Sequence, residues 1–150
     1  CKEGIMTGIS EDKFGLGKGV TRDDLAIILN NFIKAAGYDL PAVREAVVYT
    51  DDNRIGTPYE EAISTLQQSG IMMGYSDNSF KPKAYVSRAE MCVILHRLIK
   101  VVTDPASAQG WAMNDDGGYM YYEEGKALTG LHEIDGKEYY FNDKGILETE

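Results

Sequence analysis

The sequence predicts an α+β protein in which α-helical helix–loop–helix repeats come first and β-hairpin repeats come last. Residues 4–34 align without gaps on residues 70–100, and each copy ends in apolar residues at helical spacing. From residue 110 the period changes to 20 residues, and aromatic segments alternate with glycine turns. The charge changes near residue 104, which marks a boundary. Residues 1–103 carry 12 Lys and Arg against 13 Asp and Glu, whereas residues 104–150 carry 3 against 11.

The composition of the 150-residue chain excludes several classes of function. Hydrophobic residues make up 43%, which predicts a packed core. A formal net charge of −9 without a continuous basic stripe argues against nucleic-acid binding. No apolar run approaches the roughly 18 residues of a membrane span. The chain opens on Cys1 with neither a starting Met nor a signal peptide, so we expect a fragment or processed piece. Cys1 and Cys92 make no disulfide framework, and their redox state stays open.

The two copies at an offset of 66 residues share the features of one structural unit. The unit is predicted to run from a helix through a glycine turn and an extended loop to a capped helix. In the second copy Ser87 and Glu90 have capping-box spacing, and Thr21 and Asp24 are their counterparts. The identical pairs include Gly4/Gly70, Gly8/Gly74, Phe14/Phe80, Val20/Val86, Arg22/Arg88, Ile28/Ile94 and Leu29/Leu95.

A further helix is expected between the two copies. Thr57 and Glu60 have capping-box spacing, with Pro58 at the first helical position. This helix should end before Gly70, a typical C′ residue. Residues 42–49 are compatible with a short helix or with an extended link. The first copy lacks its leading helix, except for what residues 1–3 supply.

The last third of the chain contains two copies of a hairpin, residues 110–130 and 130–150. Each copy is predicted to form an aromatic strand, a turn with glycine and a short returning strand. Isolated hairpins are marginally stable in water, so we expect these to stack or to pack on a neighbour. Residues 104–109 are the predicted linker.

Residues 57–100 resemble an S-layer homology (SLH) repeat. The resemblance rests on the leading helix, on residues 70–82 (GIMMGYSDNSFKP) and on residues 86–90 (VSRAE), preceded by residues 49–51 (YTD). Residues 4–36 resemble the second half of another repeat. The resemblance implies a module over residues 1–103, with a half repeat at 1–37 and a full repeat at 45–103.

The SLH family implies non-covalent attachment of exported proteins to bacterial cell-wall polysaccharides, often pyruvylated ones, at the extracellular surface. We expect no cofactor and no membrane span. Three repeats commonly form a bundle, and one and a half are visible here, which leaves open whether several chains combine to complete it.

Residues 110–150 resemble the aromatic cell-wall-binding repeats of the choline-binding type. Gly110-Trp111, residues 119–122 and residues 129–131 fit one copy, and residues 136–141 with Gly145 fit the next. The resemblance implies a choline or glycan site formed by Trp111, Tyr119, Tyr121 and Tyr139, because aromatic faces bind cations. The alternative is that these rings are the hairpins' own packing surface.

Arg88 is the strongest candidate for binding a ligand, and Arg22 is its counterpart in the first copy. Each follows a helix cap, where the helix dipole is positive and a cation is disfavoured without an anion nearby. The free amides of a helix start and the guanidinium fork both suit a carboxylate, such as that of a pyruvate ketal on a sugar. The alternative is that Arg88 pairs with Asp77, Glu90 or an acid of a neighbouring helix.

Four loop residues beside the second cap are further candidates for sugar contacts: Tyr75, Asp77, Lys81 and Lys83. They are equally compatible with ordinary turn residues on a solvated loop. Phe14 and Phe80 are expected to be packing anchors.

No residue pattern predicts catalysis or a metal site. Cys92 and His96 have a spacing that can bind a metal or activate a thiol. The first copy has different residues at both positions, so we expect a structural role. The acidic turns at 51–53 and 115–117 lack the ligand pattern of an EF-hand. The sequence thus predicts a non-catalytic module that anchors a larger bacterial surface protein to envelope polysaccharide. The alternative is a protein–protein docking module that has lost glycan binding.

Overall fold

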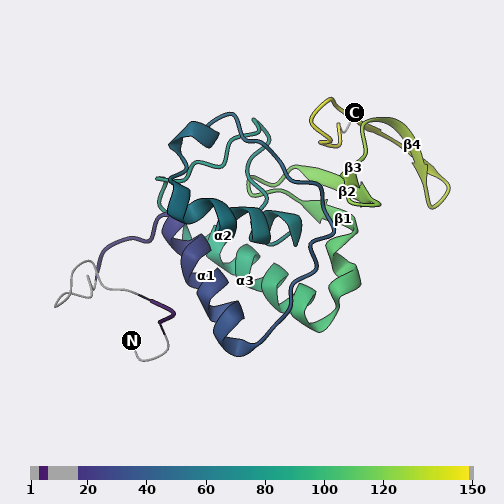
Figure 1. The fold of residues 1–150 in the computed structure, drawn as a ribbon. Coiled ribbons are helices and arrows are strands. Elements are labelled where there is room, and N and C mark those ends of the chain that lie inside the picture. The colour runs from purple at the N-terminus through teal and green to yellow at the C-terminus, as the bar shows by residue number, and fades with distance from the viewer. Residues whose placement is uncertain (1–3, 7–16, 149–150) are drawn as a thin grey trace.

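A computed structural model describes residues 4–6 and 17–148, and Figure 1 shows its ribbon. Helices come first and strands last, which confirms the predicted α+β class. The leading segment at residues 1–3 and the loop of the first copy with Phe14 lie outside the described residues. The elements are α1 (Arg22–Ala36), η1 (Asp52–Arg54), α2 (Thr57–Gln68), α3 (Arg88–Thr103), η2 (Pro105–Ala108), β1 (Gly110–Met113), β2 (Tyr119–Glu123), β3 (Lys126–Ala127), β4 (Gly130–Ile134) and β5 (Lys137–Phe141).

The three α-helices bury their apolar stripes in one core, which the loop after α2 completes. Leu66, Ile71, Met72 and Phe80 are all fully buried. Each such side chain contributes roughly 1.5–3 kcal/mol relative to an exposed one. Phe80 is therefore a packing anchor, as the sequence predicted. The other core residues are Leu25, Ala26, Leu29, Ile33, Tyr49, Ile55, Ala62, Ile63, Ile94 and Leu98.

The start of α3 has the predicted capping box. The Ser87 hydroxyl accepts a hydrogen bond from the Glu90 amide (3.2 Å), and the Glu90 carboxylate accepts one from the Ser87 amide (2.8 Å). Thr21 occupies the N-cap position of α1, but its side chain makes no cap hydrogen bond. Its hydroxyl donates to the Asp23 and Asp24 carboxylates, at 2.6 and 2.7 Å, and accepts no backbone hydrogen bond.

The predicted capping box at Thr57 is wrong. The helix begins one residue earlier than its pattern indicated, because Gly56 takes the extended cap conformation (φ −78°, ψ 145°) and Thr57 is already helical. The side chain of Thr57 therefore makes no cap bond, and Pro58, expected at the first helical position, is the second residue of the helix. At the other end, Gly70 has φ +74° after the last helical turn, as predicted for a C′ residue.

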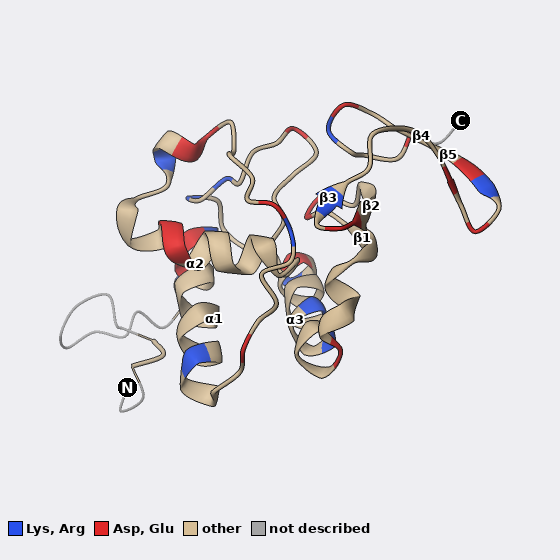
Figure 2. Cartoon of the chain, turned by 45° about the vertical axis from the view of Figure 1, so that its right-hand side comes forward, with Lys and Arg blue, Asp and Glu red and all other residues tan. Residues whose placement is uncertain are grey.

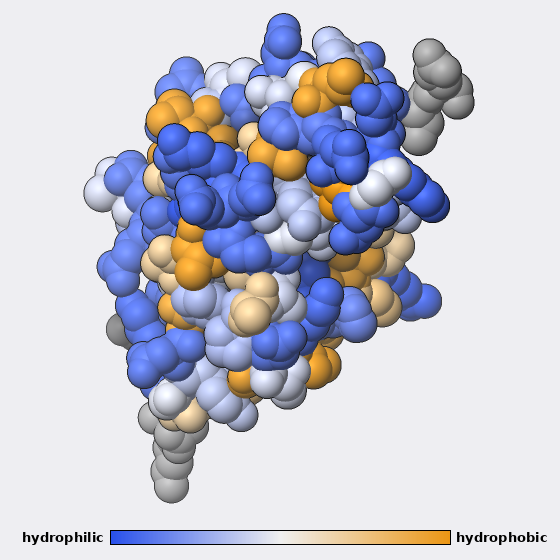
Figure 3. All heavy atoms as spheres, turned by 90° about the vertical axis from the view of Figure 1, so that its right-hand side faces the viewer, coloured by the Kyte–Doolittle hydropathy of each residue, from blue (hydrophilic) through white to orange (hydrophobic). Residues whose placement is uncertain are grey.

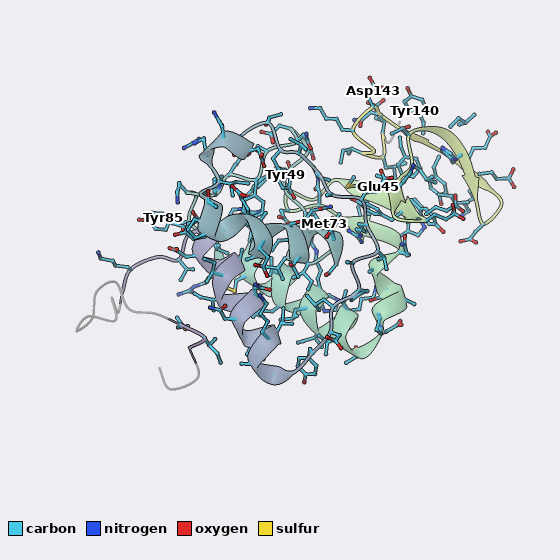
Figure 4. All side chains as sticks on the ribbon, viewed as in Figure 1. Glu45, Tyr49, Met73, Tyr85, Tyr140 and Asp143 are labelled. Carbon is cyan, nitrogen blue, oxygen red and sulfur yellow. The ribbon has the colours of Figure 1, made fainter. Side chains whose placement is uncertain are left out.

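Residues 42–49 form an extended link that contains neither helix nor strand. The link joins α2 to the tail through backbone hydrogen bonds. The Arg44 amide donates to Gln68 O (3.1 Å), and the Glu45 amide donates to Gly125 O (2.9 Å). Figure 4 shows Glu45 beside the strands. This link places Arg44 between the helices and the tail.

The tail contains two small antiparallel sheets, one of β1, β2 and β3 and one of β4 and β5. Asp135 and Gly136 join β4 to β5, with φ +53° and +78°, as in the two-residue turn favoured in hairpins. Residues 114–118 make a longer connection from β1 to β2. The β4–β5 hairpin projects away from the helices (Figure 1), whereas the β1–β2 turn contacts them.

Within the described residues, no helix is both long enough and apolar enough to cross a membrane.

Candidate functional site

The loop of the second copy covers the start of α1. The Arg22 amide donates to Ala84 O and the Asp23 amide to Pro82 O, both at 3.0 Å. Thr21 forms a β-bridge with Tyr85, which Figure 4 places at this end of α1. The loop and helix start are about sixty residues apart in the sequence, and together they make the candidate site.

Arg22 is fully buried in this site. Its Nε donates to Phe80 O (2.7 Å), and its guanidinium carbon lies 4.7 Å from the ring centroids of both Tyr75 and Phe80. Its Nη2 donates to Asp115 Oδ2 (2.6 Å). Its Nη1 has no hydrogen-bond partner among the described residues and lies 3.8 Å from Glu90 Oε1. Burial of this cation depends on Asp115.

The Asp115 carboxylate comes from the β1–β2 turn, and its side chain is 2% exposed. Besides Arg22, its Oδ2 accepts from the amides of Met73 (3.2 Å) and Gly74 (2.9 Å). Its Oδ1 accepts from Arg97 Nη1 (2.5 Å). Two guanidinium groups and two amides thus surround one carboxylate, with charge-assisted hydrogen bonds that are stronger than neutral ones.

The loop after α2 and the helix α3 hold the rest of this acidic turn by hydrogen bonds. The Asp116 carboxylate accepts from the amide (3.1 Å) and hydroxyl (2.7 Å) of Ser76. Arg97 also donates to the carbonyl oxygens of Met113 and Asn114. Sequence reasoning assigned the acidic turn to local structure and did not single out Arg97. The 20-residue repeat gave no signal for Asp115, because its counterpart Asp135 is also acidic, and the extra acid of this turn is Asp116.

Tyr75 and Glu90 connect the loop to the α3 cap. The Tyr75 hydroxyl donates to Glu90 Oε1 (2.5 Å). Burial raises the pKa of Tyr75, and the hydrogen bond to Glu90 raises it further. Burial alone would raise the pKa of Glu90. Hydrogen bonds from Tyr75 and Ser87 outweigh burial and hold the Glu90 pKa below its usual value.

Lys81, Lys83 and Asp77 lie at the surface of the site. Lys81 Nζ lies over the Tyr75 ring (3.9 Å) and 3.7 Å from Asp77 Oδ2. Lys83 pairs with the buried carboxylate of Asp23, and that hydrogen bond raises the pKa of Lys83. Asp77 is exposed, and its carboxylate accepts from the amide and hydroxyl of Ser79. The structure therefore brings both lysines and Tyr75 around Arg22.

Arg88 lies in a different environment from its counterpart. It is exposed at the first residue of α3, and within residues 17–148 its side chain makes neither a hydrogen bond nor an ion pair. Two of the acids expected as partners, Asp77 and Glu90, bind Ser79 and Tyr75 instead. No loop of the described chain covers this helix start as residues 80–86 cover α1.

The aromatic residues of the tail meet across the two hairpins. Trp111 lies 5.2 Å from Tyr121 and 5.0 Å from Tyr139, centroid to centroid, in edge-to-face arrangements. Phe141 lies 6.0 Å from Trp111. Tyr119 is 55% exposed and pairs with Met113 across the sheet. The structure thus brings together three of the four predicted residues, in the geometry that aromatic rings adopt when they pack on one another.

Cys92 and His96 are both exposed on α3. No group of three or more His, Cys, Asp or Glu in the described part of the chain could hold a metal ion.

Figure 2 shows the acidic residues of the tail along β4 and β5 and at their turn.

Comparison with known proteins identifies an S-layer homology domain at residues 48–92, which include the end of the link, α2, the loop of the site and the first turn of α3. The chain is also similar to "Cell surface glycoprotein 1" of Acetivibrio thermocellus, with 24% identity over 102 residues. That similarity covers 65% of this chain and 4% of the relative, so the chain spans a small part of that protein's length. No solved structure matches.

S-layer homology domains are non-catalytic modules that anchor proteins to the cell wall. The domain and the similarity indicate an extracellular, cell-surface protein associated with the cell wall. The matched residues end at 92 and do not include the aromatic tail.

Proposed function

We propose that this chain is a non-catalytic module that anchors a larger surface protein to a cell-wall polysaccharide, with an anionic group of the polymer held at an Arg-bearing helix start. One observation carries the proposal. At the start of α1 the protein already binds a carboxylate, that of Asp115, through Arg22 and the amides of Met73 and Gly74. The same arrangement suits a carboxylate on a sugar, such as a pyruvate ketal.

The two helix starts differ in what a polymer would have to do. At α3, Arg88 is exposed and a ligand can approach it directly. At α1, a ligand would have to displace Asp115 from the buried Arg22. Around Arg22, the exposed ends of Lys81 and Lys83 would attract an anionic polymer, and Asp77 would accept a hydroxyl hydrogen bond. Tyr75 would stack on a sugar ring once Lys81 moved off its face.

A second candidate function is protein–protein docking. The second copy's loop covers the start of α1, and no described segment covers the start of α3 in that way. Ile99 and Leu95 of α3 are 64% and 41% exposed. Figure 3 shows hydrophobic patches between polar residues on the face that it presents. A further repeat, or a second copy of the chain that completes a bundle, would cover such surfaces.

Cosedimentation with purified cell-wall sacculi separates the two functions. Anchoring requires that the chain pellets with intact sacculi and stays in solution with sacculi stripped of their secondary polymers. Arg88→Ala and the double variant Lys81→Ala/Lys83→Ala should lower the pelleted fraction several-fold. Lys34→Ala removes an exposed cation that pairs with Glu61 away from the site, and it should pellet like the wild type. Equal pelleting with intact and stripped sacculi would contradict anchoring, and a concentration-dependent dimer would then favour docking.

The tail is tested in the same assay by elution with choline. Release of the bound chain by choline, and the absence of that release in Tyr139→Ala, would assign binding to the aromatic residues. Tyr140→Ala is a matched control, because Tyr140 is 50% exposed on the same strand and makes no ring contact with Trp111. Retention in choline would leave binding with the helix starts.

A further inference from the structure

A cavity of about 350 Å³ lies between α3 and β1. Its volume is in the range of small-molecule pockets, roughly 300–1,000 Å³. Its walls are largely apolar, from Val93, Val101 and Met113 among others. None of the described residues that line it is acidic, although the whole chain has a net charge of −9.

The cavity wall contains a buried cation. Arg44 is 4% exposed, and no carboxylate of the described residues forms an ion pair with it. A second cation, Arg97, also acts on Arg44, and the Arg97 guanidinium already binds Asp115. Burial lowers the pKa of Arg44 and Arg97 also lowers it, whereas Tyr122 raises it and only partly offsets the burial. A buried charge without a counter-charge is costly, and an anion in the cavity would remove that cost.

The protein holds the Arg44 guanidinium in a fixed orientation. Its Nε donates to Ala108 O (2.7 Å), and its guanidinium carbon lies 3.8 Å from the centroid of the Tyr122 ring. It also packs against Gly70, where any Cβ would collide with the guanidinium. Only a sulfur atom, Met73 Sδ at 3.1 Å, accepts from its Nη1. The guanidinium is thus held in place while its Nη1 has only a thioether sulfur, a weak acceptor, as its partner.

The mouth of the cavity combines an imidazole and a further cation with an aromatic ring. His96 and Lys100 are four residues apart on α3 and both are exposed. Trp111 of β1, at 39% exposure, forms part of the opposite wall. A ligand with a flat apolar face would pack on Trp111 while its anionic group reached Arg44 and Lys100.

We propose that this cavity binds a sugar ring that carries a carboxylate or a phosphate group. The anion pairs with Arg44 and Lys100, and the ring packs on Trp111 and the apolar walls. Neither Arg22 nor Arg88 lines the cavity, although Met73 and Arg97 of its wall also bind Asp115. The proposal does not depend on wall anchoring, because a free sugar acid is sufficient to occupy the cavity.

The test uses the fluorescence of Trp111, which is the only tryptophan of the chain. The full-length chain is titrated at constant ionic strength with glucuronate, glucose 6-phosphate and glucose. Saturable change with either acid and none with glucose is the expected result, and the more effective acid identifies carboxylate or phosphate as the anion. Equal response to glucose, or no saturation by either acid, would overturn the proposal.

Variants then assign the contacts. Lys100→Ala should weaken binding of the better acid about tenfold, equivalent to about 1.4 kcal/mol. Arg44→Gln should abolish it, and circular dichroism establishes whether that variant is folded. Lys126→Ala is the control, because Lys126 is an exposed cation that pairs with Glu45 and does not line the cavity. Unchanged affinity in Lys100→Ala, or equal weakening in Lys126→Ala, would contradict the assigned site whatever the behaviour of Arg44→Gln.

Discussion

Arg22 and Asp115 are 93 residues apart in the sequence, and their side chains form a buried ion pair at 2.6 Å. The pair joins the start of the first helix to the first turn of the tail. It also supplies the internal example of carboxylate binding on which the proposed function rests.

Asp115→Asn should strongly destabilise the protein. The substitution leaves two guanidinium groups, those of Arg22 and Arg97, without their counter-charge, and breaking a buried pair costs about 3–5 kcal/mol. Urea unfolding monitored by circular dichroism measures the change. Asp116→Asn is the matched control on the adjacent exposed residue, and it should cost less than about 1 kcal/mol. Equal losses in the two variants would show that the ion pair contributes little.

The two capping-box patterns should respond differently to alanine. Ser87→Ala removes a cap hydrogen bond and should cost about 1 kcal/mol of the free energy of unfolding. Thr57→Ala removes no such bond and should change stability by less than about 0.5 kcal/mol. Chemical denaturation of both variants provides the measurement. A larger loss at Thr57 would contradict the structure at the start of α2.

Gly125→Ala should destabilise the protein by disturbing the contact between the link at residues 42–49 and the tail. Gly125 has φ +85°, and a Cβ there would overlap the carbonyl oxygen of Val43. Gly136 also has a positive φ (+78°) but open space around it, so Gly136→Ala incurs only the left-handed strain of about 1–2 kcal/mol. Thermal unfolding should show the larger loss for Gly125→Ala. If the two losses were equal, the close contact of Gly125 with the link would be in doubt.

The ionised Glu90 side chain should stabilise the folded protein, and this contribution should be lost in acid. Its pKa lies below the ordinary value of 4.5 in the folded protein, so its stabilising contribution is present above that value and is lost as the pH falls through the folded pKa. Glu90→Gln should therefore lower stability at neutral pH, and the difference from the wild type should shrink as the pH falls below the ordinary Glu value of 4.5. Urea unfolding at several pH values tests this. A difference that stayed constant with pH would mean that the charge of Glu90 has no role.

The sequence was informative where the signal is local or repeated. The Ser87–Glu90 spacing predicted the cap of α3, Gly70 predicted the end of α2, and the 66-residue repeat predicted that Arg22 and Arg88 begin equivalent helices. The Thr57 pattern failed because spacing alone cannot tell which of two adjacent residues takes the extended cap conformation. Gly56 takes it here.

Sequence patterns could not predict the surroundings of the candidate residues. Whether an arginine is buried or exposed depends on which distant loop covers its helix, and that difference separates Arg22 from Arg88. The partners of Asp115 come from three separate segments of the chain, and no spacing rule connects them. Arg44 looked like one residue of an unassigned link until the structure placed it in a cavity wall.

The acidic turn after β1 has a practical consequence for dividing this protein. Composition marks a boundary near residue 104, where an experimenter would naturally cut the gene. A recombinant chain that ended at residue 109 would keep every helix and yet lose the carboxylate that neutralises Arg22 and Arg97. Whoever transplants the helical part to another protein must therefore carry the first hairpin with it.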